Sequence, residues 1–570
     1  MRALHEHTRF LITRMKISTK LAYVALAQEQ IARKSGDAAA IAAAASLTLL
    51  CAQTVQAANR MPPPRPIEAQ KPAPTLHIDG GDIAIPAADI DGVRAYKGLP
   101  YAAPPTGSFR WREPQPVIPW SGVRATDRFG PNCLQPKVYN DIDPFTPSMS
   151  EDCLYLNVWT AAKPRERLPV FFWIHGGGYQ AGSGSELRHD GTALAKKGVV
   201  VVTINYRLGV FGFLAHPELT AESPHHASGD YAFLDMIAAL QWVQRNIAAF
   251  GGDPTRVTIA GESAGSDAVA RLMASPLAKG LFQRAIGESG SPFGEWAGEA
   301  LSEAEANGVA FAHAMSGDDI AQLRARSSAE ILALESEKQP EWQFDADVDG
   351  WFLPKPVPAI FAAGEQNDVP LIVGWNRDEG VFFHAAGDNE KLAGYFVRKF
   401  GNESAQAARL YPAASPQEEE RSRIDLGTDV NMGLPIWRWA MAQRTTGHAP
   451  VYLYRFDHAP PVPPEWFGKA MEGKFTGAFH SADIAYVFGH PDVMQGWRVT
   501  AEDRALADEI SSAVAAFAAT GDPNAAGLPQ WPAYDPNAPQ RMIFDDPSHA
   551  APDVDVVRRQ FLNAALPMPP

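Results

Sequence analysis

The sequence predicts an α/β fold, in which a large, mostly parallel sheet carries helices on both faces. Several short apolar runs are rich in β-branched and aromatic residues and do not alternate with polar ones, which is typical of strands buried on both faces. Helical patterns lie between these runs, as in parallel sheets. With 46% hydrophobic and only 20% charged residues, the 570-residue chain can also bury a large core.

The N-terminal part differs from the rest of the chain. Residues 1–57 carry seven basic and three acidic residues and end in the uncharged run 38–52, which is too short to span a bilayer comfortably. A basic lead, an apolar stretch and the small-residue exit "VQA" predict a secretory signal over 1–57, with Met15 as a possible true start. A buried alanine-rich helix is the alternative. Residues 58–74 are rich in proline and predict an exposed tether, followed by a single domain over 75–565.

The strands and helices of that domain can be placed from their patterns. The predicted strands are "LPVFFWI" (168–174), "GVVVVTI" (198–204), "RVTIA" (256–260), "PLIVGW" (370–375) and "VYLYRF" (451–456). The clearest helical patterns cover 229–250 and 501–519. Two helix-rich insertions, 290–360 and 385–445, are expected to build the walls of a pocket.

The stretch "TIAGESAG", residues 258–265, places Ser263 on a tight turn between a strand and a helix. The small residues Gly261 and Gly265 let the backbone fold sharply there, which lifts the hydroxyl clear of the sheet at a helix N-terminus. A serine in this position is typical of a nucleophile, which needs a base to take its proton and donors to bind the oxyanion.

A glycine triplet, Gly176 to Gly178, follows the predicted strand 168–174 directly. Backbone N–H groups can point into a site there without side chains in the way. We expect Gly177 and Gly178, with the N–H of Ala264, to form an oxyanion hole. The alternative is a merely flexible turn.

Charge and cysteine content limit the partners. Without residues 1–57 the net charge is about −19, which disfavours nucleic acid and anionic membranes. Cys133 and Cys153 remain after the lead, and in an oxidising compartment such a pair favours one disulfide over a metal site. Because the sequence contains no metal-ligand cluster, phosphate loop or dinucleotide fingerprint, no cofactor is expected. The oligomeric state stays open.

Several motifs together resemble one family. "KGLPYAAPPTGSFRW" (97–111), "EDCLYLNVW" (151–159), "HGGG" (175–178), "FGGDPTRVTIAGESAG" (250–265) and "GWNRDEG" (374–380) are similar to the type-B carboxylesterases. The resemblance covers about 75–545 and implies an α/β-hydrolase fold with a triad in the order Ser, acid, His. It assigns the acid to Glu379 and the base to His480 of "GAFHSADIAYVFG". It also matches Cys133 and Cys153 to the first disulfide loop of that family.

The sequence offers alternatives to some of these site residues. Asp378 neighbours Glu379, and adjacent side chains on an extended chain point in opposite directions, so only one can face His480; the resemblance favours Glu379. His384 is the alternative base, since it lies close to a catalytic strand. Glu262, beside the nucleophile, either supports the site or is a solvated turn carboxylate. His175 is expected to support the glycine turn, and Asp483 stands where relatives commonly have Glu, a difference that affects only the hydrogen bonding behind the triad.

The resemblance also implies the reaction and the pocket. The expected activity is hydrolysis of a small-molecule carboxylic ester by water through an acyl-enzyme, in a secreted or periplasmic protein. By similarity, the acyl pocket is walled by Trp296, Trp342 and Phe344, and the gorge is lined by Phe382 and Phe383; ordinary core positions are the alternative. Two indoles would favour short acyl groups. Asp143 stands where cholinesterases have a choline-stacking tryptophan, so no choline esterase is expected.

Two other classes of function are compatible with parts of the sequence. The same triad could cleave an amide, carbamate or thioester, because leaving-group preference depends on pocket shape. A non-catalytic binding protein is the other class. The presence of Ser263, Glu379, His480 and the glycine triplet argues against it.

Overall fold

The computed structural model describes residues 74–568 except for 90, 140, 143–147, 318, 338–343, 388–389, 464–465 and 469–473, together with scattered residues between 30 and 49. The predicted signal (1–57) and proline-rich tether (58–74) lie almost wholly outside the described residues. The chain divides into two compact units, 1–73 and 74–570, and the second carries the fold. No helix within the described residues is long and apolar enough to cross a membrane.

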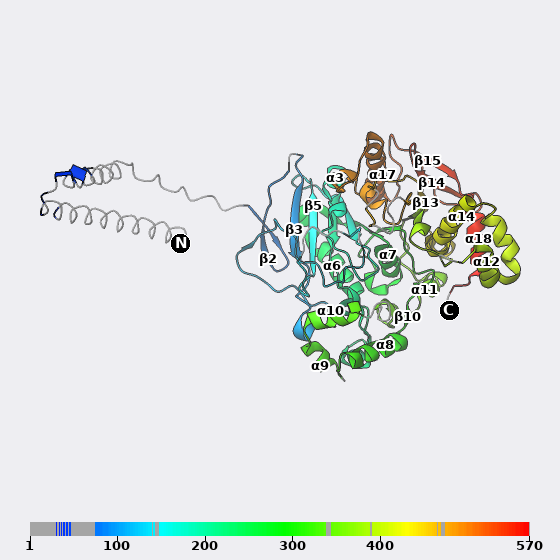
Figure 1. Cartoon of the computed structure of the whole chain (residues 1–570), viewed down its shortest axis with the longest axis horizontal. Coiled ribbons are helices and arrows are strands. Elements are labelled where there is room, and N and C mark those ends of the chain that lie inside the picture. The colour runs from blue at the N-terminus through cyan, green and yellow to red at the C-terminus, as the bar shows by residue number, and fades with distance from the viewer. Residues whose placement is uncertain are drawn as a thin grey trace. The chain divides into compact units, whose positions relative to one another are not determined.

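A ten-stranded sheet forms the centre of the second unit, in the order β15-β14-β13-β12-β9-β8-β6-β7-β5-β3 (Figure 1). The strands from β14 to β7 in this order pair in parallel, and β15, β5 and β3 add antiparallel edges. Their bounds are β3 Arg94–Pro100, β5 Tyr155–Thr160, β6 Leu168–Ile174, β7 Val200–Ile204, β8 Gly252–Glu262, β9 Arg284–Glu288, β12 Leu371–Asn376, β13 Val451–Phe456, β14 Gln540–Phe544 and β15 His549–Pro552.

The central strands are buried on both faces, as the non-alternating apolar runs predict. Along β6, Phe172 and Ile174 pack into one core, whereas Phe171 and Trp173 pack into a second core on the opposite face. Successive side chains of a strand point to opposite faces, so a strand covered on both sides must be apolar at every position. The predicted α/β architecture is therefore confirmed.

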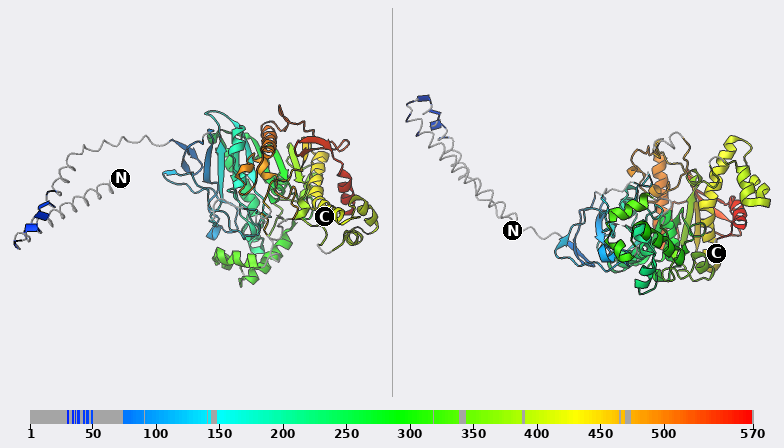
Figure 2. Two further views of the ribbon diagram at one scale, coloured as in Figure 1. Left: turned by 45° about the horizontal axis from the view of Figure 1, so that its top comes forward. Right: turned by 60° about the horizontal axis from the view of Figure 1, so that its bottom comes forward.

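Helices cover each face of the sheet (Figure 2). The first core contains residues of α6 (Tyr231–Asn246), α7 (Ala264–Ala274), α11 (Val357–Ala362) and α15 (Leu434–Thr446). The second core contains residues of α3 (Thr192–Lys196), α16 (Ile484–Val487) and α17 (Ala501–Thr520). Helix α17 begins at a capping box, in which Thr500 and Asp503 satisfy each other's backbone N–H groups. The predicted helix 229–250 corresponds to α6 and the 3-10 helix Ile247–Phe250 that follows it, and the predicted helix 501–519 corresponds to α17.

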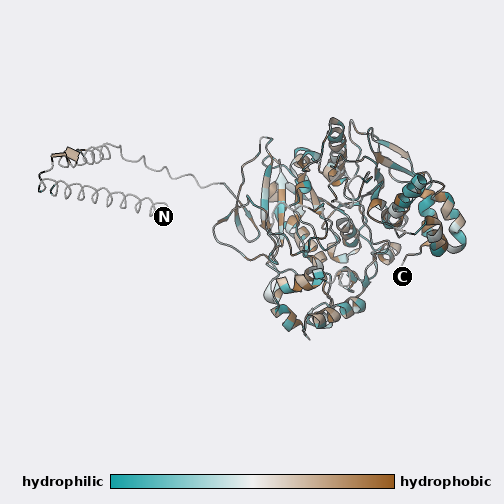
Figure 3. Cartoon of the chain, in the orientation of Figure 1, coloured by the Kyte–Doolittle hydropathy of each residue, from teal (hydrophilic) through white to brown (hydrophobic). Residues whose placement is uncertain are grey.

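The two insertions are helical, as expected. Residues 290–360 contain α8 (Leu301–Ala314), α9 (Ile320–Ala325), α10 (Ser328–Glu337) and α11, and residues 385–445 contain α12 (Leu392–Phe400), α13 (Ser404–Leu410), α14 (Pro416–Thr428) and α15. Figure 3 shows hydrophilic residues concentrated on outer helices such as α14. Besides short 3-10 helices, the other helices are α4 Gly209–Phe213, α5 Pro217–Glu222, α18 Val556–Ala565 and the π-helix Asp429–Gly433. Two small sheets complete the described fold, one of β1 Thr75–Ile78, β2 Gly81–Ala84 and β4 Val123–Arg124, and the other of β10 Glu299–Ala300 and β11 Asp347–Val348.

Candidate active site

Ser263 lies on the sharp turn between β8 and α7, where the sequence places it. Its φ of 57° and ψ of −124° are sparsely populated for a residue with a side chain, as is typical of the strained strand-to-helix turns that carry nucleophilic serines. The turn requires its glycines because backbone atoms approach closely. A Cβ on Gly265 would lie 2.1 Å from the carbonyl oxygen of Ile174, and a Cβ on Gly261 would lie 2.5 Å from Gly265.

The glycine triplet after β6 lies directly against this turn. Gly177 and Gly178 have φ values of 108° and 59°, a region that favours glycine. A Cβ on Gly176 would come within 3.0 Å of the Ser263 Cβ. Gly177, Gly178 and Ala264 line the same cavity as Ser263.

Glu379 follows β12 and is fully buried beneath His480. Its Oε2 lies 2.7 Å from Nδ1 of His480. Its Oε1 accepts a hydrogen bond of 2.8 Å from the Ser289 hydroxyl and one of 2.6 Å from the Asn376 backbone N–H. Three contacts therefore hold the carboxylate toward the imidazole, which is the arrangement of acid and histidine found in Ser-His-acid triads.

Asp378 points elsewhere, although the two residues do not lie on an extended chain, because Asp378 precedes the short 3-10 helix Glu379–Val381 with φ −117° and ψ 28°. One oxygen accepts from the Arg421 guanidinium, and the other accepts a 2.9 Å hydrogen bond from the Ala478 backbone N–H. The structure thus brings Glu379, and not Asp378, to His480. The alternative base, His384, is exposed and does not line the cavity that the described residues form.

His480 lies between two carboxyl groups. Its Nε2 is 3.3 Å from Oε1 of Glu262, a residue only 2% exposed, so Glu262 is not a solvated turn carboxylate. Burial disfavours the imidazolium, but the charges of Glu262 and Glu379 outweigh it and raise the pKa of His480 to about 9. For Glu262, burial itself raises the pKa, to about 8, although the charge of His480 opposes this shift.

The structure brings Ser263, Glu379 and His480 together at one site. Within the described residues no hydrogen bond joins the Ser263 hydroxyl to His480, although both side chains line the same cavity. Catalytic hydrogen bonds are often long or poorly aligned in enzymes without substrate and tighten in the complex.

The cavity has a volume of about 800 Å³ and opens to solvent. Of the predicted aromatic residues, Trp296 and Phe383 line it, and the Phe383 ring meets the His480 ring edge-on at 4.7 Å. Phe344 instead packs against Phe311 at 5.2 Å, and Phe382 packs against Phe467 at 4.8 Å. Phe344 and Phe382 therefore do not line the described wall of the cavity, because each side chain packs into a hydrophobic cluster with a residue distant in the sequence. Trp342 and Asp143 lie outside the described residues.

Several polar wall residues come from loops without a recognisable motif. Asp141 lies 3.3 Å from the Arg188 guanidinium and accepts a 3.0 Å hydrogen bond from the Ser481 hydroxyl. Asp345 also lines the cavity, and burial raises its pKa to about 6. Asp345 and Trp296 belong to the 290–360 insertion, whereas no described residue of the 385–445 insertion lines this cavity; Arg421, Asp425, Thr428 and Asp429 of that second insertion line another cavity, so both insertions build cavity walls as expected.

Further groups stabilise the site from behind. His175 is buried and stacks on Tyr206 at 4.3 Å, and burial lowers its pKa to about 4, so this neutral ring supports the glycine turn. Asp483 accepts hydrogen bonds from the Asn376 side chain at 3.0 Å and the Tyr454 hydroxyl at 2.8 Å. The Asn376 backbone N–H in turn donates to Glu379, so the shorter Asp483 still supports the position of Glu379 through Asn376.

A disulfide joins Cys133 and Cys153, as predicted. Within the described residues, no group of three or more His, Cys, Asp or Glu side chains could hold a metal ion.

Comparison with known proteins agrees with this geometry. The model of the "Carboxylesterase family" matches residues 73–555. The chain is 36% identical over 492 residues to the fumonisin B1 esterase of Sphingopyxis macrogoltabida, covering 82% of this chain and 86% of the relative. It is 36% identical over 497 residues to the para-nitrobenzyl esterase of Bacillus subtilis (strain 168), covering 83% and 95%.

The fold agrees as well. A solved structure of "PNB esterase" superposes with a TM-score of 0.71 at 35% sequence identity, covering 86% of this chain and 99% of that one. This similarity makes the architecture an α/β-hydrolase fold. The chain therefore belongs to the carboxylesterase family and is a serine hydrolase of carboxylic esters.

Proposed function

We propose that Ser263 is the nucleophile of this esterase, His480 its general base and Glu379 the acid that orients the base. The observation that carries the proposal is the 2.7 Å contact between Glu379 and His480 at the wall of the cavity that Ser263 also lines. The strained elbow at Ser263 adds support, since such strain occurs mainly where function requires it.

The proposed reaction has two halves. His480 takes the proton of Ser263 as the hydroxyl oxygen attacks the ester carbonyl carbon, and Gly177, Gly178 and Ala264 donate N–H hydrogen bonds to the oxyanion. The C–O bond to the alcohol then breaks, and His480 gives the alcohol its proton. Water, activated by the same histidine, attacks the acyl-enzyme and releases the carboxylic acid and the free serine.

The substrate class follows from the wall of the cavity. Two relatives are named for fumonisin B1 and para-nitrobenzyl esters, which indicates that related sites take different esters. Trp296 and Phe383 narrow the cavity beside Ser263, and we propose that this chain takes small-molecule esters with short acyl groups. Amides, carbamates and thioesters would use the same triad, and their turnover depends on the leaving group.

The triad assignment can be tested by three variants. Ser263→Ala and Glu379→Gln should each lower kcat for p-nitrophenyl acetate by roughly 10⁴-fold. Asp378→Asn is the matched control, because Asp378 bonds Arg421 and Ala478 instead of the imidazole, and it should lose much less activity. If Ser263→Ala retained wild-type turnover, the nucleophile would be wrong; a wild-type protein without turnover would support a binding role.

We further propose that residues 1–57 are a secretory signal and that the domain works outside the cytoplasm. The Cys133–Cys153 disulfide supports this, because disulfides persist in oxidising compartments. Mass spectrometry of the protein exported by a bacterial host should find an N-terminus near residue 58, whereas an uncleaved cytoplasmic product would contradict the proposal.

A further inference from the structure

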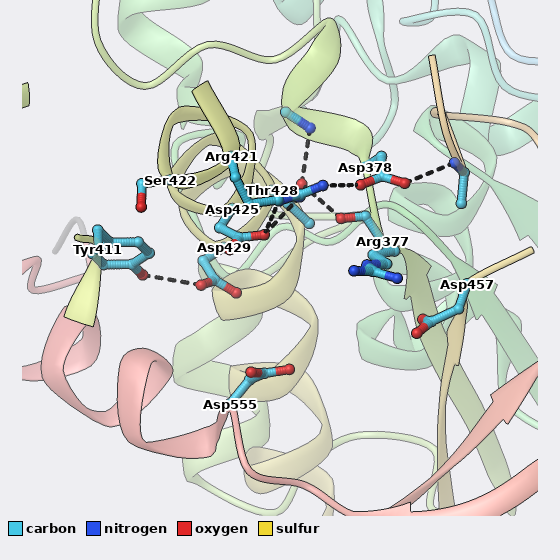
Figure 4. Close-up of polar contacts among 12 residues, drawn as sticks. Arg377, Asp378, Tyr411, Arg421, Ser422, Asp425, Thr428, Asp429, Asp457 and Asp555 are labelled. Carbon is cyan, nitrogen blue, oxygen red and sulfur yellow. Dashed lines mark hydrogen bonds and ion pairs between the residues drawn. The ribbon is translucent and has the colours of Figure 1, made fainter. Parts of the chain in front are cut away.

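A second cavity lies on another part of the domain and is walled mainly by arginines. It has a volume of about 700 Å³, opens to solvent, and shares no lining residue with the catalytic cavity within the described part of the chain. We call it the arginine cavity, and its lining residues are Trp375, Arg377, Arg421, Asp425, Thr428, Asp429, Arg455, Arg541, Val554, Asp555, Arg558 and Arg559. Figure 4 shows part of this wall, where β12, α14 and α18 meet.

The wall contains more positive than negative groups. Six arginines line it against three aspartates, and three more aspartates pair with these arginines from outside the wall: Asp378, Asp457 and Asp553. Within the described residues, five of the six arginines thus have an ion-pair partner, and Arg377 supplies the remaining positive charge. Burial lowers the pKa of Arg541, and the neighbouring Arg455 and Arg559 charges lower it further. The protein therefore holds like charges close together around a water-accessible space.

Some buried donors in this wall have no acceptor. Arg559 is fully buried, and its Nε and Nη1 have no hydrogen-bond partner among the described residues; the same holds for Nε of Arg541, which is 2% exposed. The Trp375 ring lies 4.9 Å from the Arg559 guanidinium carbon and 5.7 Å from that of Arg541. These contacts fix the guanidinium groups but provide no oxygen acceptor, and unpaired buried donors are rare in folded proteins.

Arg377 adds an available group at the same cavity. It is exposed, and Figure 4 draws no contact from its guanidinium to the neighbouring side chains shown. In contrast, Arg421 is already committed to Asp378 and Asp425. Arg377 can therefore turn toward a ligand without breaking an ion pair among the residues drawn.

We propose that the arginine cavity binds a small oxyanion carrying two or more negative charges, with phosphate or carboxylate groups. Planar guanidinium groups match the paired oxygens of such anions and form charge-assisted, often bidentate hydrogen bonds. A chloride ion offers neither the geometry nor the second charge. This site is separate from the ester chemistry and does not depend on the triad assignment.

The test is calorimetric titration of the purified protein with inorganic pyrophosphate and, separately, with citrate, at constant ionic strength set by potassium chloride. At least one anion should bind saturably with a one-to-one stoichiometry, and the tighter of the two identifies the phosphate or the carboxylate class. Arg377→Gln should weaken that binding about tenfold or more, the effect expected for losing a hydrogen bond between charged groups.

Arg409→Gln on α13 is the matched control, because it removes the same charge from an exposed residue that does not line the cavity. Its Kd should equal that of the wild type. Arg377 is chosen for substitution instead of the buried Arg541 and Arg559 because shortening an exposed side chain leaves no internal void. Equal Tm values of the wild type and both variants will verify that they are folded. If neither anion binds beyond the chloride background, or if both variants change the Kd equally, the proposal is wrong, whatever the outcome for ester hydrolysis.

Discussion

The Gly265→Ala substitution tests how closely the nucleophile elbow is packed. The new Cβ would lie 2.1 Å from the carbonyl oxygen of Ile174 at the end of β6, whereas real Cβ contacts are essentially never shorter than 3.0 Å. Neither the new Cβ nor the Ile174 carbonyl can move away by a side-chain rotation, so the backbone of the elbow or of β6 must shift by about 1 Å. A displacement of this size at a catalytic group costs on the order of 10²-fold in rate, and the overpacking costs about 1–3 kcal/mol of stability.

The assay is kcat/KM for p-nitrophenyl acetate, with the active fraction titrated from the burst of p-nitrophenol, beside Tm by calorimetry. Gly394→Ala in α12 is the matched control, because no atom outside its own helix backbone lies within 4 Å of the position that the new Cβ would take, and the glycine has ordinary helical geometry. Alanine there should raise stability by about 0.5–1 kcal/mol and leave kcat/KM unchanged. Wild-type kcat/KM and Tm in Gly265→Ala would refute the steric reasoning.

Three further predictions concern the charge, the disulfide and the cavity wall. Glu262 and Glu379 raise the pKa of His480 to about 9 against the effect of burial. Because the base must be neutral, kcat/KM should rise with pH toward that value. Glu262→Gln should shift this rise to lower pH, and an unshifted rise would count against the role of Glu262. Replacing Cys133 and Cys153 by serine opens a loop with a sequence separation of 20 and should lower the free energy of unfolding by about 3 kcal/mol in urea titrations; equal midpoints would contradict this. Trp296→Ala should raise kcat/KM for an octanoate ester relative to acetate by about tenfold, and an unchanged ratio would show that the indole does not limit acyl length.

Local features of the chain were predictable because their causes are local. The apolar runs locate five of the parallel strands, since a strand covered on both faces has to be apolar throughout. Two parallel strands, β9 and β14, are not among the predicted runs: Arg284–Glu288 is short and begins and ends with a charged residue, and Gln540–Phe544 is short and begins with two polar residues. The elbow at Ser263 and the glycine triplet were readable for the same local reason, as backbone crowding admits only small residues there.

The acid of the site shows how far the motifs reach. "DEG" names two candidates, and resemblance to the family favours Glu379. The contacts that separate the two carboxylates come from distant parts of the chain: Ser289 and His480 approach Glu379, whereas Arg421 and Ala478 approach Asp378. No pattern around residue 379 records these partners.

The cavity walls were the least predictable part. Phe344 and Phe382 have the same chemistry as Phe383, yet only Phe383 lines the cavity, because packing with Phe311 and Phe467 turns the other two away. The arginine cavity likewise combines residues from 375 to 559 that have no common motif. Local backbone crowding and the pattern of apolar residues thus specify the layers of the fold, the turn at Ser263 and its glycines. The choice between Glu379 and Asp378, the shape of the pocket and the second cavity instead depend on contacts between distant segments, which meet only when the sheet has assembled.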